Sequence, residues 1–216
     1  MRVMKRLILA MDVEERERAL ALAALLRDEL AAIKVNYPLV LSCGIGIVRE
    51  LSEVRPVICD FKAADVPHTN EMIARIAKAS GARALICHGF MGRESIEACS
   101  SVMDTIVVAE MSNAGSREFF EGNSLRLIEL ALEAKAVGLI APATKPERIS
   151  HIRSMAPDLM ILSPGVGAQG GRAEDAIKNG ADFVIVGRAI YDSGDPLEAA
   201  RTMNGEIEAA YKKLKP

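Results

Sequence analysis

The sequence repeats one pattern eight times: a short apolar run is followed by a longer segment in which apolar residues recur at helical spacing. Near-continuous apolar runs are typical of parallel strands that are buried on both faces, and the longer segments predict helices. Eight such units within about 200 to 250 residues close naturally into a barrel. The pattern therefore predicts an α/β fold, a single-domain, parallel eight-stranded (β/α)8 TIM barrel that covers residues 1–216.

Strands and helices are predicted in alternation along the whole chain. The strands are expected at 7–11, 32–35, 84–88, 105–109, 137–141, 159–162 and 183–186, with a further strand that begins at 57 and includes 60 and 62. The helices are expected at 14–30, 67–79, 93–101, 124–134, 146–155, 173–178 and 196–214, with one more that ends near 53. Residues 113–123 are expected to form a long connection. The competing architecture, an open doubly wound sheet, places phosphate-binding glycines after its first strand, whereas Asp12-Val13-Glu14 stands there.

Composition excludes several classes of partner. Half of the 216 residues are apolar and 26% are charged, which is ordinary for a soluble globular protein. The net charge of −2 offers no attraction for nucleic acid or an anionic membrane, and no apolar run reaches the roughly 18 residues of a membrane span. The four cysteines lack the paired close spacing of a zinc site, and the basic N-terminus lacks a signal cleavage pattern. A cytoplasmic location is expected.

Charged residues gather at the predicted ends of the first three strands. Asp12 follows the first strand, Lys34 lies in the second, and Asp60 and Lys62 lie two residues apart at the end of the third, with Asp65 just beyond. Residues two apart on a strand share a face, and the carboxyl ends of the strands hold the active site in this barrel. An ion-pair network that merely closes the barrel is the alternative. Because buried ion pairs stabilise a fold only weakly, the cluster favours catalysis.

A glycine-rich loop at 163–171 follows the seventh predicted strand, and Gly187-Arg188 follows the eighth. Phosphate groups commonly bind to these two loops of the barrel. Glycines allow backbone N–H groups to approach an anion, and an arginine adds a bidentate contact. The loop by itself is equally compatible with a tight turn, but together with Arg188 it predicts a phosphate site. Gln169, the only glutamine of the chain, is expected to bind phosphate or a base edge.

The histidines give a weaker signal. His68 and His151 lie within predicted helices and are expected at the surface, whereas His88 ends a strand and is either a hydrogen-bonded interior residue or a catalytic one. The chain contains no His-Glu-x-x-His or Ser-His-Asp pattern and no dinucleotide fingerprint.

Together, these motifs resemble the orotidine 5′-monophosphate decarboxylase family in its short archaeal form, over almost the whole chain. The resemblance is carried by the segments 9–12, 33–35, 60–69, 111–112, 163–171 and 186–188. The Asp-x-Lys-x-x-Asp core is shared with a wider superfamily of magnesium-dependent sugar-phosphate decarboxylases and aldolases. The continuation Val-Pro-x-Thr and the loop Pro-Gly-Val-Gly-Ala-Gln-Gly-Gly are more specific. Asn113-Ala114-Gly115 is a variation in the loop after the fifth strand.

The resemblance implies decarboxylation of orotidine 5′-monophosphate to uridine 5′-monophosphate, with no cofactor and no metal. Lys62 would protonate C6 of the pyrimidine after carbon dioxide departs. Asp60 and Asp65 would flank Lys62, and Lys34 would complete the charged array. Asp65 and Thr69 would reach into the neighbouring subunit's site, which implies a homodimer.

The resemblance also implies a set of substrate-binding residues. These are Asp12 and Lys34 at the ribose hydroxyls, Ser112 and Gln169 at the pyrimidine, Gln169, Gly187 and Arg188 at the 5′-phosphate, and Pro164 and Gly167 in the glycine-rich loop.

Two other functions compete with this interpretation. A magnesium-dependent member of the superfamily would need a metal-binding carboxylate pair, for which Asp12 with Asp65 or Glu110 could serve. A catalytically silent protein that binds a phosphorylated ligand is the second alternative, and the intact charged array disfavours it.

Overall fold

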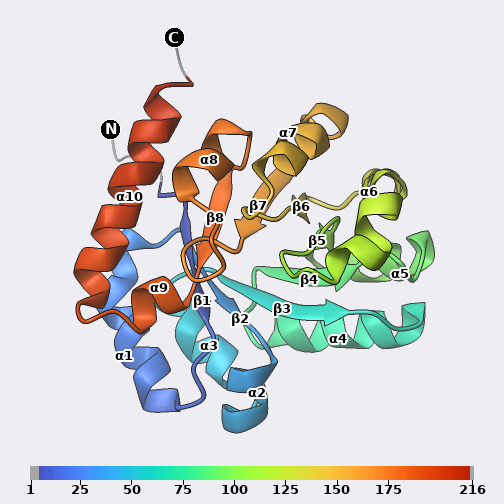
Figure 1. Cartoon of the computed structure of the whole chain (residues 1–216). Coiled ribbons are helices and arrows are strands. Elements are labelled where there is room, and N and C mark those ends of the chain that lie inside the picture. Colours follow the sequence, from blue (N-terminus) through green and yellow to red (C-terminus); the bar gives the residue numbers. More distant parts are fainter. Residues whose placement is uncertain (1–4, 215–216) are drawn as a thin grey trace.

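The computed structural model describes residues 5–214 and shows a closed barrel of eight parallel strands with helices around it (Figure 1). The strands are β1 (Leu7–Met11), β2 (Ala32–Val35), β3 (Val57–Ala63), β4 (Ala84–His88), β5 (Asp104–Val108), β6 (Gly138–Ile140), β7 (Met160–Pro164) and β8 (Phe183–Val186). Neighbours in the sequence are neighbours in the sheet, and β8 pairs with β1 through Leu7↔Val184 and Leu9↔Val186. The predicted barrel is confirmed.

The helices cover the outside of the barrel. They are α1 (Arg16–Leu26), the 3-10 helix η1 (Arg27–Glu29), α2 (Tyr37–Cys43), α3 (Ile47–Ser52), α4 (Pro67–Ala79), α5 (Arg93–Ser100), α6 (Ser116–Glu133), α7 (Pro146–Met155), α8 (Ala173–Lys178), α9 (Arg188–Tyr191) and α10 (Pro196–Lys212). The predicted bounds of α4, α7 and α8 are confirmed. None of the helices within 5–214 is long and apolar enough to cross a membrane.

Alternation along each strand divides the apolar residues between two cores. On β1, Leu7 and Leu9 belong to the large cluster shared with the helices, whereas Ile8 and Ala10 belong to the cluster inside the barrel. Ile58 on β3 also belongs to the interior cluster. Since side chains two apart on a strand share a face, Asp60 continues the inward direction of Ile58 toward the carboxyl end of the barrel.

Three connections are more helical than the sequence predicted. The expectation of a connection over 113–123 is wrong, because α6 begins at Ser116. Gly122 lies in this first part of α6 with open space around it, and the burial of Phe120 outweighs the low helix propensity of glycine. The short helices α2 and α9 were not predicted either. Pro38 fits the first turn of α2, where its missing N–H costs nothing.

Candidate active site

A pocket of about 270 Å³ opens at the carboxyl ends of the strands. Nine of the residues predicted for the site line it. They are Asp12, Lys34, Asp60, Lys62, Ser112, Pro164, Gln169, Gly187 and Arg188. The strand order places the loop after β8 beside β1, so the side chains follow one another around the rim as Arg188, Asp12, Lys34 and Lys62.

Asp60 lies at the centre of the charged array. Its Oδ2 accepts a hydrogen bond from Lys34 Nζ at 2.8 Å, and its Oδ1 accepts one from Lys62 Nζ at 2.8 Å. Lys34 Nζ also lies 3.7 Å from Asp12 Oδ1. The two ammonium groups thus share one carboxylate, and the four side chains form a continuous line of alternating charge.

Burial and charge act in opposite directions on Asp60. Burial by itself would raise the pKa of this carboxyl group, because it disfavours the charged form. The charges of Lys34 and Lys62 and the hydrogen bonds that they donate outweigh this effect, so the pKa of Asp60 lies below its ordinary value. The carboxylate is therefore ionised at neutral pH and holds both ammonium groups in place.

The backbone at Lys62 is unusual. Its φ is +43°, in the left-handed region that a non-glycine residue rarely adopts, and the register between β3 and β4 shifts between Cys59 and Ala63. Bulges of this kind re-aim a side chain next to active sites. Tyr37, at the start of α2, donates a hydrogen bond from its hydroxyl to the carbonyl oxygen of Phe61. This contact fixes the backbone between Asp60 and Lys62.

Asp65 and Thr69 are not brought to the charged array within one chain. Asp65 is exposed, does not line the pocket, and accepts a hydrogen bond at Oδ1 from the N–H of Val66 at 2.7 Å. Its own N–H donates to Oδ1 of Asn70. Thr69, half-buried in the first turn of α4, does not line the pocket either. Their contribution to a neighbouring subunit stays a prediction.

The glycine-rich loop folds back on itself across the mouth of the pocket. Gly171 N–H donates to the carbonyl oxygen of Gly165, and Gly167 N–H donates to that of Gly171. Gly167 has a φ of +76°, and a Cβ there would lie 2.6 Å from the Cβ of Ala189 on α9. The predicted residue Gly167 is thus required for packing against α9 and is not itself in the pocket wall.

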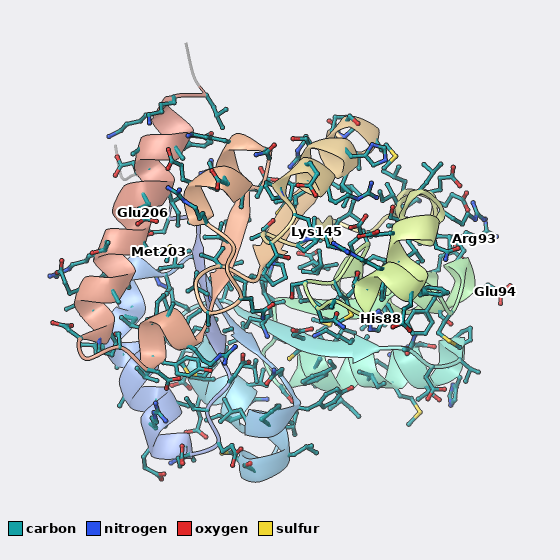
Figure 2. The ribbon with its side chains drawn as sticks, in the orientation of Figure 1. His88, Arg93, Glu94, Lys145, Met203 and Glu206 are labelled. Carbon is teal, nitrogen blue, oxygen red and sulfur yellow. The ribbon has the colours of Figure 1, made fainter. Side chains whose placement is uncertain are left out.

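His88, labelled in Figure 2 at the end of β4, is half-buried and does not line the pocket. Its ring packs 4.7 Å from that of Phe90 and 5.8 Å from that of Phe120. Among the described residues its buried Nδ1 has no hydrogen-bond partner. Burial, and then the nearby charge of Lys62, lower the pKa of His88 to about 4, while Asp60 acts in the opposite direction. The imidazole is therefore neutral at physiological pH. His68 and His151 are exposed, as predicted.

Glu110, two residues beyond the end of β5, is completely buried but does not line the pocket. Its Oε1 accepts hydrogen bonds from both Nε, at 2.8 Å, and Nη2 of Arg148 on α7. Within one chain, neither Glu110 nor the exposed Asp65 lines the pocket beside Asp12, so the carboxylate pairs proposed for magnesium are not assembled there. Across residues 5–214 no group of three or more His, Cys, Asp or Glu side chains is placed to hold a metal ion.

Several pocket residues were not predicted from the sequence. Asn36 and Tyr191 line the pocket beside the charged groups, and an apolar wall is formed by Ile86, Val108, Ile140 and Ile185. A search confined to charged strand ends overlooks a neutral amide. The apolar wall was detectable, because each of its members lies on the inward face of a strand near its carboxyl end.

Known proteins share both this sequence and this architecture. Residues 5–203 match the sequence model of the Orotidine 5′-phosphate decarboxylase / HUMPS family. The orotidine 5′-phosphate decarboxylase of Thermococcus kodakarensis is 54% identical over 205 residues, which cover 94% of this chain and 96% of that protein. The orotidine 5′-phosphate decarboxylase of Methanosarcina barkeri is 49% identical over 213 residues, 96% of each.

Solved structures agree with the sequence comparison. The orotidine 5′-monophosphate decarboxylase of Methanocaldococcus jannaschii, complexed with the inhibitor BMP, superposes with a TM-score of 0.90 at 42% identity and covers 94% of this chain and 99% of that one. The orotidine 5′-phosphate decarboxylase of Pyrococcus horikoshii has a TM-score of 0.89 at 46% identity, with 94% and 99% covered. The chain therefore belongs to the orotidine 5′-phosphate decarboxylase / HUMPS family.

Proposed function

We propose that this protein is a carboxy-lyase that converts orotidine 5′-monophosphate into uridine 5′-monophosphate and carbon dioxide. The observation that carries the proposal is the pair of 2.8 Å contacts that hold Lys34 and Lys62 on Asp60 at the pocket wall. Family membership supports the same activity.

The reaction needs a cation beside C6 of the pyrimidine. When the bond between C6 and the carboxylate carbon breaks, its electron pair stays on C6 and carbon dioxide leaves. A fixed ammonium group beside that carbon stabilises the developing negative charge without reorganisation. We assign this role to Lys62, which then transfers a proton from Nζ to C6 and recovers one from water. No cofactor takes part in these steps.

The array favours stabilisation of the carbanion over repulsion of the substrate. An isolated Asp60 would repel the substrate carboxylate by about 4 kcal/mol at ~4 Å in an effective dielectric near 20. Each oxygen of Asp60 already accepts a hydrogen bond from an ammonium group, however, so its charge is largely compensated before the substrate binds. The attraction between Lys62 and the substrate becomes more favourable as negative charge concentrates on C6.

The order of side chains around the rim matches the order of phosphate, ribose and base along a nucleotide. We place the 5′-phosphate on Arg188, Gly187 and Gln169, the ribose hydroxyls on Asp12 and Lys34, and C6 beside Lys62. Ser112 and Gln169 then lie within the same pocket for contacts with the pyrimidine, at the loops after β5 and β7. Binding of the phosphate, remote from C6, can supply energy for orientation and for closure of the glycine-rich loop.

We further propose a homodimer in which Asp65 and Thr69 complete the partner's site. The exposed position of Asp65 suits this role, and beside it Val66 is 54% exposed although apolar. Mixing the inactive variants Asp65→Ala and Lys62→Ala tests the proposal. Subunit exchange would create heterodimers with one intact site and restore activity, whereas a mixture that stays inactive would argue against sites shared between subunits.

We also propose a location, a domain organisation and a class of partner for the enzyme. The substrate is a small soluble nucleotide, so we place the enzyme in the cytoplasm as one catalytic domain over residues 1–216, with neither nucleic acid nor membrane as partner.

The direct test is to mix purified protein with orotidine 5′-monophosphate and record the absorbance change of decarboxylation. Activity is expected to persist in EDTA. Loss of activity in EDTA that magnesium restores would support the magnesium-dependent alternative instead. Binding of uridine 5′-monophosphate without turnover of the substrate would support the silent binding protein.

A further inference from the structure

Asn36 occupies the N-cap position of α2 but does not cap it. Its backbone is extended, with φ −124° and ψ −171°, and its side chain makes no cap hydrogen bond. Asparagine at this position normally accepts a hydrogen bond from the N–H of the second or third helical residue. The second residue of α2 is Pro38, which has no N–H, and the side chain of Asn36 makes no hydrogen bond with the remaining N–H of Leu39. Asn36 is therefore available for another contact.

Asn36 lines the pocket, and the oxygen of its side-chain amide lacks a hydrogen-bond partner. Oδ1 is buried and has no hydrogen bond with any residue in the described range 5–214. A buried polar atom without a hydrogen bond costs about 1–3 kcal/mol, so such groups in native structures usually have a partner. Because Asn36 lines the pocket, a ligand bound there can supply the missing partner once the amide turns toward it.

The location of Asn36 indicates which part of a nucleotide it meets. It stands directly after β2, two residues beyond Lys34, whose Nζ lies 3.7 Å from Asp12 Oδ1. These two charged residues are our proposed contacts for the ribose. An amide both donates and accepts hydrogen bonds, which suits a hydroxyl group, whereas phosphate and carboxylate groups favour cations.

The backbone next to Asn36 is held firmly. The adjacent Tyr37 stacks on Phe61, with ring centroids 5.6 Å apart, and donates its hydroxyl hydrogen bond to the carbonyl oxygen of Phe61. This contact ties the start of α2 to the segment of β3 that carries Asp60 and Lys62. The amide is thus presented to the pocket by the same framework that positions the charged array.

We propose that Asn36 is a specificity residue whose side-chain amide hydrogen-bonds a ribose hydroxyl of the bound nucleotide. The protein uses it to prefer ribonucleotides over deoxyribonucleotides. This inference rests on the proposed function, because it assumes that a pyrimidine nucleotide occupies the pocket.

The test compares the Kd of uridine 5′-monophosphate with those of its 2′-deoxy and 3′-deoxy forms, measured calorimetrically for the wild type and for Asn36→Ala. For one of the two deoxy ligands, the ribo-to-deoxy preference is expected to fall about three- to tenfold in N36A, the value of one neutral hydrogen bond. Asn36→Gly is the second variant, since glycine is tolerated at N-cap positions. Asn123→Ala is the control, because Asn123 is exposed on α6 and bonds the carbonyl oxygen of Phe119.

The outcomes separate this inference from the proposed function. Unchanged preferences for both deoxy ligands in N36A and N36G, with uridine 5′-monophosphate still bound, overturn the role of Asn36 alone. A wild-type protein that neither binds uridine 5′-monophosphate nor decarboxylates the substrate overturns both. A general loss of affinity that is equal for all three ligands also contradicts the assignment, because it would reflect a changed pocket shape and not a lost hydroxyl contact.

Discussion

Lys62 Nζ lies 2.8 Å from Oδ1 of Asp60, two residues earlier on β3, although the backbone between them does not follow a regular strand. The φ of +43° at Lys62 costs conformational energy of about 1–3 kcal/mol, which the surrounding structure must offset. Strain of this kind is concentrated at functional sites, and here it aims the ammonium group into the pocket beside the carboxylate.

Replacing Lys62 by alanine is expected to abolish decarboxylation while nucleotide binding persists. Loss of the fixed cation and of the proton donor should lower kcat at least 10³-fold, on the order of the effect of a transition-state contact or a general acid. Turnover of orotidine 5′-monophosphate and the Kd of uridine 5′-monophosphate check this. Lys178→Ala, at a surface lysine paired with Glu174, is the control. Persistent turnover in K62A would show that another group delivers the proton.

Arg188 is expected to recognise the phosphate and little else. Arg188→Ala should raise KM for the phosphorylated substrate about 100-fold or more, since a charge-assisted contact contributes about 1.5–3 kcal/mol and the bidentate form uses two. The unphosphorylated nucleoside should be affected little. Steady-state kinetics with both substrates, with Arg172→Ala as an exposed control, test the assignment. Equal losses for both substrates would contradict it.

Asp60→Asn should destabilise the fold at neutral pH by about 3 kcal/mol, because it leaves two ammonium groups without their shared anion. The folded-state pKa of Asp60 lies below its ordinary value of 3.8, so this stabilisation is fully present above about pH 4 and is lost as the pH falls through the folded-state pKa. Urea unfolding of the wild type and D60N at pH 7 and in acid measures the difference. A stability gap that stays constant down to pH 2 would refute the linkage.

Arg148 is expected to be essential for stability through Glu110. Arg148→Met leaves a completely buried carboxylate without its cation and should cost about 3–5 kcal/mol. The double variant Glu110→Gln/Arg148→Met should be more stable than R148M, since the buried charge is gone. A thermodynamic cycle of unfolding free energies checks this. A double variant less stable than R148M would contradict the pairing.

His88 should make the stability of the fold sensitive to mild acid. With a folded-state pKa of about 4 against an ordinary value of 6.5, the unfolded chain binds a proton in this interval that the folded protein does not. Stability should therefore fall as the pH decreases from 6.5 to 4. The Tm of His88→Gln should vary less over this interval than that of the wild type, whereas the exposed His151→Gln should match the wild type. Identical pH profiles for H88Q and the wild type would disprove this role.

Much of the site was predictable because local patterns carry it. Short, near-continuous apolar runs mark the strands, and the residues that end those strands must meet at one rim once the barrel closes. Asp12, Lys34, Asp60, Lys62 and Arg188 were accessible by this reasoning. The short helix α2 was not predicted, and the role of Asn36 depends on that helix.

The sequence by itself determined the alternation of strands and helices, the barrel, and which charged residues stand at its carboxyl rim, since each follows from spacing along the chain. Only the tertiary structure decided that one carboxylate is shared by two ammonium groups, that β8 brings Arg188 next to Asp12, and that Asp65 points away from its own pocket. The physical reason is that closure of the barrel sets distances between side chains far apart in sequence. The positive φ of Lys62 depends on a shift in strand pairing, which no local pattern encodes.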